Sequence, residues 1–162
     1  MTSKDQLLER IRTKQQAWRE LVAEVGRDRM NEPGPMGEWT FKDLVSHLAG
    51  WRNRTIARLE AAGRGEPEPA NPWPDGLADD DDDSINAWIH DRDRDRSLDD
   101  LLADYDSSFD RLAAAVAALP NDVATNPDFF PWMEGTAVVD GDFFSHLDDE
   151  HEPSIREWLA TR

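Results

Sequence analysis

The chain has 162 residues, of which 38% are hydrophobic and seven are tryptophans, and this predicts one folded domain spanning residues 1–162. It contains no cysteine, which excludes disulfides and thiolate metal ligands. Its 35 acidic and 18 basic residues leave a net charge of −17, which repels phosphate backbones and argues against nucleic-acid binding.

No apolar run approaches the roughly 20 residues needed to cross a bilayer, and the first residues lack the apolar core of a signal peptide. We therefore expect a cytoplasmic protein that does not bind membranes. The strong acidity has two explanations, solubility or a patch that recruits a cationic ligand.

The first two predicted helices begin at recognisable caps. Ser3 is a good N-cap residue, and apolar residues follow at helical spacing as far as Gly26, a natural stop. Residues 31–37 (NEPGPMG) predict a loop. Thr40 and Asp43 then resemble a capping box, with Asp in place of the usual Glu or Gln, and open a second helix that ends near Gly63.

Residues 63–83 are predicted to be irregular, because they hold four prolines and end in the acidic run Asp79–Asp83. A loop of this length inside a compact domain is often functional, and disorder is the alternative. Trp73 in its middle is either an anchor folded over the domain or an exposed aromatic.

The second half of the chain predicts three more helices. Residues 84–94 form a short one. Its end overlaps the run Asp91–Arg96, which we expect to be a solvated, self-neutralising turn. Ser97 caps a third long helix that ends at Pro120. Residues 126–135 form an aromatic loop, and the last helix is expected from about Asp140 to Leu159.

Four amphipathic helices of about 20 residues with almost no strand signal predict an all-α fold. The natural solution is a four-helix bundle with long crossover loops and a short extra helix.

Three of the four histidines have a layout that suggests one site. His47 follows Leu44 by three residues, and His151 follows Leu147 by four, so both are expected on the inward faces of their helices. If the second and last helices pack side by side, the two imidazoles meet in one pocket.

The position of His146 depends on the shape of the last helix. On a regular helix, five residues leave it about 140° away from His151. Pro153 cannot donate a backbone hydrogen bond, and if the break takes the form of a one-residue π-bulge, His146 returns to the side of His151. Without a bulge, Asp148 is the better companion ligand. His90 is expected to be an exposed surface histidine.

A set of His47 and His151 with either His146 or Asp148 would suit Zn, Ni or Fe and leave coordination positions open for substrate. The alternative is that the inward histidines are hydrogen-bonded core residues. No Gly-rich phosphate loop, Cys nucleophile or convincing Ser triad is present, which argues against phosphotransfer and serine-hydrolase chemistry.

Four segments together resemble the DinB superfamily of four-helix bundles, and most closely its ClbS/DfsB-like branch. They are Glu38–Trp51 (EWTFKDLVSHLAGW), Ile85-Asn86, Ser97–Leu102 (SLDDLL) and His146–Leu159 (HLDDEHEPSIREWL). The resemblance runs in order along nearly the whole chain, and its first segment is the most specific.

The resemblance implies a divalent-metal site formed by the histidine matching His47 and a histidine pair on the last helix. Here that pair is His146 and His151, spaced by five residues instead of the usual four. Some superfamily members use the metal for thiol transfer or isomerisation with low-molecular-weight thiols. The ClbS/DfsB-like branch is instead known for hydrolysing a strained cyclopropane in a genotoxin without an obvious metal.

Three hypotheses follow for the function. The first, which we favour, is a detoxification or self-protection enzyme that hydrolyses a strained ring in a small electrophile. His47, His151, Asp148 and Glu150 would be its acid–base groups. Its pocket would be lined by Trp39, Trp51, Trp73, Tyr105 and Trp132.

The second hypothesis is a metal-dependent thiol transferase or isomerase, with His47, His146 and His151 as metal ligands. The third is a non-catalytic bundle that sequesters a ligand. In each case the partner is a small molecule, and a homodimer formed through a helix face is plausible for such bundles.

Overall fold

The computed structural model describes residues 2–78 and 80–161, so Asp79, the first residue of the acidic run, lies outside the described residues. Its long helices are α1 (Lys4–Val25), α2 (Phe41–Gly63) and α4 (Leu98–Ala118). The last helix consists of a π-helical stretch, His146–His151, continued by α6 (Glu152–Leu159). The predicted all-α bundle is confirmed.

The predicted caps form where the sequence places them. The Ser3 hydroxyl accepts a hydrogen bond from the Gln6 backbone N–H, and Thr40 does the same for Asp43, each closing a full capping box. Ser97 caps α4 through the N–H of Asp100. These side chains satisfy N–H groups that the first turn of a helix leaves without partners.

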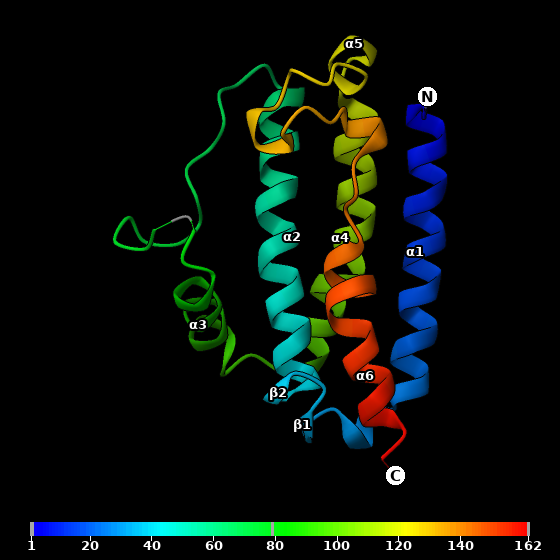
Figure 1. Ribbon diagram of the computed structural model, residues 1–162, viewed down its shortest axis with the longest axis vertical. Coiled ribbons are helices and arrows are strands. Elements are labelled where there is room, and N and C mark those ends of the chain that lie inside the picture. The colour runs from blue at the N-terminus through cyan, green and yellow to red at the C-terminus, as the bar shows by residue number, and fades with distance from the viewer. Residues whose placement is uncertain (1, 79, 162) are drawn as a thin grey trace.

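The bundle has one long crossover (Figure 1). α1 runs down, α2 and α4 both run up, and the last helix returns between α1 and α2. α4 packs against both α1 and α2. Because α2 and α4 are parallel, the chain between them must return along the length of the bundle, and residues 64–97 do this.

The core is a continuous apolar cluster between these helices. Trp18 stacks on Phe41 with ring centroids 5.7 Å apart and meets Tyr105 edge-on at 4.7 Å. Edge-on and stacked aromatic pairs of this kind add to the stabilisation that burial already provides. α1, α2 and α4 are thereby held together beside the inner face of the last helix.

Shorter elements fill the ends of the bundle. Two strands, β1 (Pro33–Gly34) and β2 (Gly37–Thr40), make a small antiparallel ribbon where a loop was predicted. α5 spans Asn121–Ala124, and 3₁₀ turns span Arg27–Arg29, Pro131–Met133 and Val138–Asp140.

The crossover segment begins with residues 64–78, which lie beside α2, and it leads to α3 (Asp82–Asp93). α3 begins before the predicted Ser84, because the Asp81 carboxylate caps it by accepting from the Ser84 N–H. Trp73 is 4% exposed and packs with Ile85 and Ile89, so it is an anchor and not an exposed aromatic.

The last helix starts later than predicted. The sequence indicated a helix from about Asp140, but a 3₁₀ turn ends there and the last helix begins only near His146, with a π-helical stretch. The carboxylate of Asp142 accepts from the backbone N–H groups of Phe144 and Ser145. This local turn competes with continuous helix, as Asp side chains commonly do.

The Asp91–Arg96 run is not fully solvated, contrary to the prediction. Asp93 is 3% exposed, accepts a 2.8 Å hydrogen bond from the Ser46 hydroxyl, and pairs with Arg92. A carboxylate can be buried when it is paired and hydrogen-bonded in this way. Asp93 therefore fastens the end of α3 to α2.

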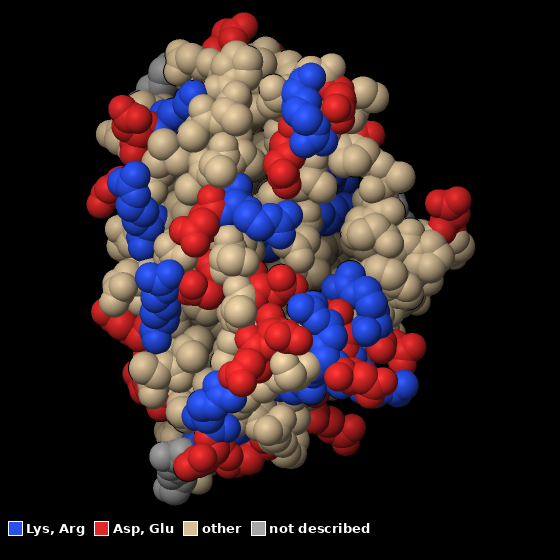
Figure 2. Space-filling view, turned by 180° about the vertical axis from the view of Figure 1, so that it is seen from behind, with Lys and Arg blue, Asp and Glu red and all other residues tan. Residues whose placement is uncertain are grey.

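Acidic and basic side chains are mixed on the face of the molecule that lies behind the view of Figure 1. Seen from behind, acidic and basic side chains interleave over the face without separating into two halves (Figure 2). Within the described residues, no helix is both long and apolar enough to cross a membrane.

Candidate functional site

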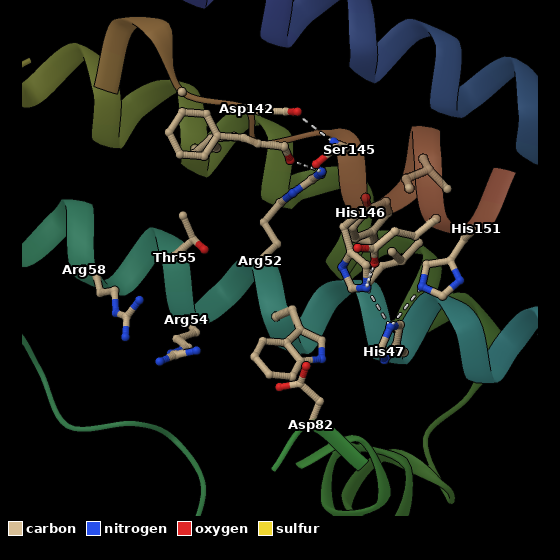
Figure 3. A pocket seen from close by; sticks show the side chains of 18 of the residues that line it. His47, Arg52, Arg54, Thr55, Arg58, Asp82, Asp142, Ser145, His146 and His151 are labelled. Atoms are coloured by element: carbon tan, nitrogen blue, oxygen red, sulfur yellow. Dashed lines mark hydrogen bonds and ion pairs between the residues drawn. The ribbon is translucent and has the colours of Figure 1, made fainter. Parts of the chain in front are cut away.

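Three histidines from two ends of the chain meet inside the bundle (Figure 3). The Nε2 atom of His47, on α2, lies 2.8 Å from Nε2 of His146 and 3.2 Å from Nε2 of His151, both on the last helix. His47 is buried and the other two are partly buried. All three rings therefore present the same nitrogen to one point.

The π-helical turn brings His146 beside His151. His146–His151 forms a π-helix, which takes one residue more per turn than an α-helix, so positions five apart share a face. Pro153 follows two residues later and supplies no N–H for a regular α-helical hydrogen bond. The conditional prediction of a π-bulge is confirmed, although it extends over the whole interval between the histidines.

The environment keeps these imidazoles neutral. The pKa of His47 falls to about 3, chiefly because the ring is buried and further because His146 and His151 are neighbours. Burial also lowers the pKa of His146 to about 4, with smaller effects from His151 and Arg52. Burial lowers the pKa of His151 as well. A neutral imidazole is the form that ligates a metal.

The geometry of the cluster fits a metal ion. Histidine nitrogens bind Zn at about 2.0–2.1 Å, so two such ligands on a tetrahedral ion lie about 3.3 Å apart. The ligand atoms here all lie within 4.8 Å of one another. Nδ1 of His47 is buried without a hydrogen-bond partner in the described part of the chain. Three protein ligands would leave a coordination position open, as in catalytic sites.

The cluster opens into a cavity of about 590 Å³, a size typical of small-molecule sites. Its wall is formed mainly by α2, the aromatic loop near Trp132, and the start of the last helix. The predicted residues Trp51, Tyr105 and Trp132 line it, and so does Glu150. The Trp51 indole N–H donates to Asn86 at 2.7 Å, which fixes that ring at the wall.

Two of the predicted pocket aromatics lie outside the cavity wall. Trp73 packs behind Trp51, with ring centroids 5.5 Å apart. Trp39 stacks on His90 at 4.7 Å and meets His47 edge-on at 6.1 Å. His90 also contacts Asp43 at 3.2 Å and is partly buried, so the prediction of an exposed surface histidine is wrong.

The two carboxylates predicted as acid–base groups, Asp148 and Glu150, lie in different places. Asp148 turns toward α1, where its carboxylate lies 2.5 Å from the Lys14 ammonium, so the structure does not place it with the histidines. Glu150 does lie there, with Oε2 3.6 Å from Nε2 of His146, and its side chain is 67% exposed. Of the two carboxylates, only Glu150 is placed to exchange a proton beside the cluster.

The sequence arguments missed the arginines of the cavity wall. Arg52, Arg54 and Arg58 all line the cavity from α2. In Figure 3, Arg52 points toward Asp142 and Ser145, while Arg54 and Arg58 point to the opposite side. A signal was present, because Arg52 follows the core residue Leu48 by four positions and so shares its helix face.

Comparison with known families places this site in context. Residues 11–137 match the model of the mycothiol maleylpyruvate isomerase N-terminal domain. The chain belongs to this family. The family is part of the DinB-like superfamily, so the superfamily resemblance is confirmed, while the ClbS/DfsB-like branch finds no support. No curated protein and no solved structure matches the chain significantly.

The matched residues of the mycothiol maleylpyruvate isomerase N-terminal domain include His47 and end before His146. The histidine pair of the last helix lies outside the matched residues, and its contacts with His47 come from the structure alone.

Proposed function

We propose that this protein is a divalent-metal-dependent transferase or isomerase that uses a low-molecular-weight thiol against a small electrophile. The observation that carries the proposal is the convergence of three neutral Nε2 atoms at the end of a 590 Å³ cavity. Membership in a family named for a mycothiol-dependent isomerase supports the thiol. Between the hypotheses from the sequence, this favours thiol chemistry over hydrolysis of a strained ring.

His47, His146 and His151 would hold the ion. When bound, a divalent metal supplies Lewis acidity, which favours the deprotonated form of a thiol near neutral pH. The chain has no cysteine, so the reacting sulfur must come from a co-substrate. Zn, Ni and Fe all suit an all-imidazole site with open positions.

The chain's own residues would handle the proton and the substrate. Glu150 is exposed next to His146 and would accept the thiol proton and pass it to solvent. Trp51 and Trp132 offer aromatic surface for the electrophile.

The test is thiol-dependent turnover. Protein loaded separately with Zn, Ni and Fe is mixed with an electrophile panel and with mycothiol, glutathione or cysteine, and electrophile loss is followed with and without thiol. We expect turnover that needs both metal and thiol and disappears in His47→Ala. His90→Ala, outside the cluster, is the matched control and should retain activity.

Two results would count against the proposal. Turnover that proceeds equally without thiol would support hydrolysis. Turnover that is unaffected by a chelator would show that the reaction does not need a metal. Tight ligand binding without any turnover across the panel would support the sequestering bundle.

A further inference from the structure

Three arginines line the cavity of a strongly acidic protein, and two of them hold the crossover segment. Arg58 pairs with Glu68 at 3.1 Å, and its guanidinium lies over Trp132. Arg54 donates to Asn71 at 3.0 Å and stacks on Trp73. These contacts give both side chains a structural role at the cavity wall.

Arg52 has no such carboxylate. Its guanidinium lies 4.3 Å from the centroid of Phe109 and 4.6 Å from that of Tyr105. Its hydrogen bonds are long, at 3.4 Å to the Ser108 hydroxyl and 3.5 Å to the Phe143 carbonyl. Within residues 2–78 and 80–161, Arg52 forms no ion pair. A guanidinium has five N–H donors, so most of its capacity is unused.

The acidic groups near Arg52 have other partners. Asp148 is bound to Lys14, and the Asp142 carboxylate accepts two backbone N–H groups. Burial lowers the pKa of Arg52, and the nearby Tyr105 hydroxyl and the charge of Asp148 act in the opposite direction without cancelling it. A partly buried cation without a counter-ion is costly unless an anion arrives to pair with it.

Arg52 also lies within one small molecule's length of the histidines. Arg52 and the three histidines line the same cavity, and Arg52 is close enough to His146 for its charge to contribute to the lowered pKa of that histidine. Its guanidinium also donates to the carbonyl of Phe143, three residues before His146. A ligand with its reacting atom at the histidines can therefore place a second group at Arg52.

We propose that Arg52 is a specificity-determining residue that binds a carboxylate of the substrate. This rests on the proposed function and names its substrate class, small molecules that carry a carboxylate several ångströms from the reacting atom. The planar guanidinium matches a carboxylate with two parallel hydrogen bonds, and stacking on Tyr105 and Phe109 holds it in place. The carboxylate belongs to either the electrophile or the thiol.

The experiment measures binding without catalysis. Metal-free protein, kept so with a chelator, is titrated calorimetrically with 3-benzoylpropionic acid and with its methyl ester, which models an electrophile and cannot react with thiols. A second arm uses N-acetyl-S-methylcysteine and its methyl ester as the thiol model. We expect the acid of one pair to bind about tenfold or more tightly than its ester.

Variants locate the effect. Arg52→Met should abolish the preference for the acid, and Arg52→Lys should retain part of it, which also covers the case in which Arg52→Met folds poorly. Arg58→Met, a cavity arginine already paired with Glu68, is the matched control and should keep the preference. Equal binding of acid and ester in both arms would overturn the proposal, as would a preference that survives in folded Arg52→Met.

The binding experiment can fail or succeed separately from the test of the proposed function. A carboxylate preference at Arg52 without thiol-dependent turnover would retain this subsite and reject the thiol enzyme. Thiol-dependent turnover without any carboxylate preference would retain the thiol enzyme and reject the carboxylate subsite at Arg52.

Discussion

His47 and His146 bring their Nε2 atoms to within 2.8 Å, although 99 residues separate them in the chain. The contact exists because α2 and the last helix run side by side and because the π-helical turn rotates His146 inward. His151, one π-turn later, joins from the same helix at 3.2 Å. The site therefore depends on both the bundle and one local irregularity.

The three histidines should behave as one metal site. Purified protein is expected to hold close to one equivalent of divalent metal, measured by inductively coupled plasma mass spectrometry. His47→Ala or His151→Ala removes one of three ligands and should weaken metal affinity by more than the roughly 10–100-fold typical of losing an outer hydrogen-bond partner. His90→Ala should leave the content unchanged, and equal metal loss in that variant would show nonspecific binding.

Asp148 should not contribute to metal binding. Its carboxylate pairs with Lys14 on the α1 side, so Asp148→Asn is expected to leave metal content unaltered. The ion pair is partly exposed, so its loss should lower the free energy of unfolding by about 1 kcal/mol or less. Metal analysis and urea denaturation check the two parts. Metal loss in a stable Asp148→Asn variant would make Asp148 a ligand.

The spacing of the histidine pair should be adjustable by one residue. Deleting the exposed Asp149 would convert the π-helical turn to α-helix, in which residues four apart share a face. We expect this variant to fold and to keep its metal, because a π-bulge amounts to one inserted residue. An inserted alanine after Asp149 is the counterpart and should abolish metal binding. If both variants behave alike, the π-turn does not set the geometry.

The metal-free protein should lose stability as the pH falls from about 6.5 toward 4. The folded-state pKa values of His47 and His146 lie near 3 and 4, below the unfolded value of about 6.5, so the unfolded chain binds more protons in this range. Stability then rises with pH, by up to about 1.4 kcal/mol per pH unit for each group, and is complete above pH 6.5.

Chemical denaturation at pH 4.5, 5.5 and 7 tests this dependence. His47→Gln should flatten the profile, because glutamine does not titrate, whereas His90→Gln is the comparison. An unchanged slope in His47→Gln would contradict the buried, neutral state of that ring.

Much of the bundle could be predicted because its signals are local. Ser3 and Thr40 cap helices through hydrogen bonds that span three residues, and the inward position of His47 follows from its spacing to Leu44. The π-turn was predictable only as a condition, because its sequence signal is a five-residue spacing beside Pro153. The start of the last helix was missed because Asp142 forms a competing turn.

The sequence by itself determined the helices, their caps and the inward faces that carry His47 and His151, since helical periodicity relates residues only a few positions apart. Tertiary structure alone decided that His146 joins them, that Asp148 pairs with Lys14, and that Arg52 lies in the cavity wall with no ion pair among the described residues. These contacts join residues that are far apart in the sequence. They therefore depend on how the four helices pack, which local sequence patterns do not determine.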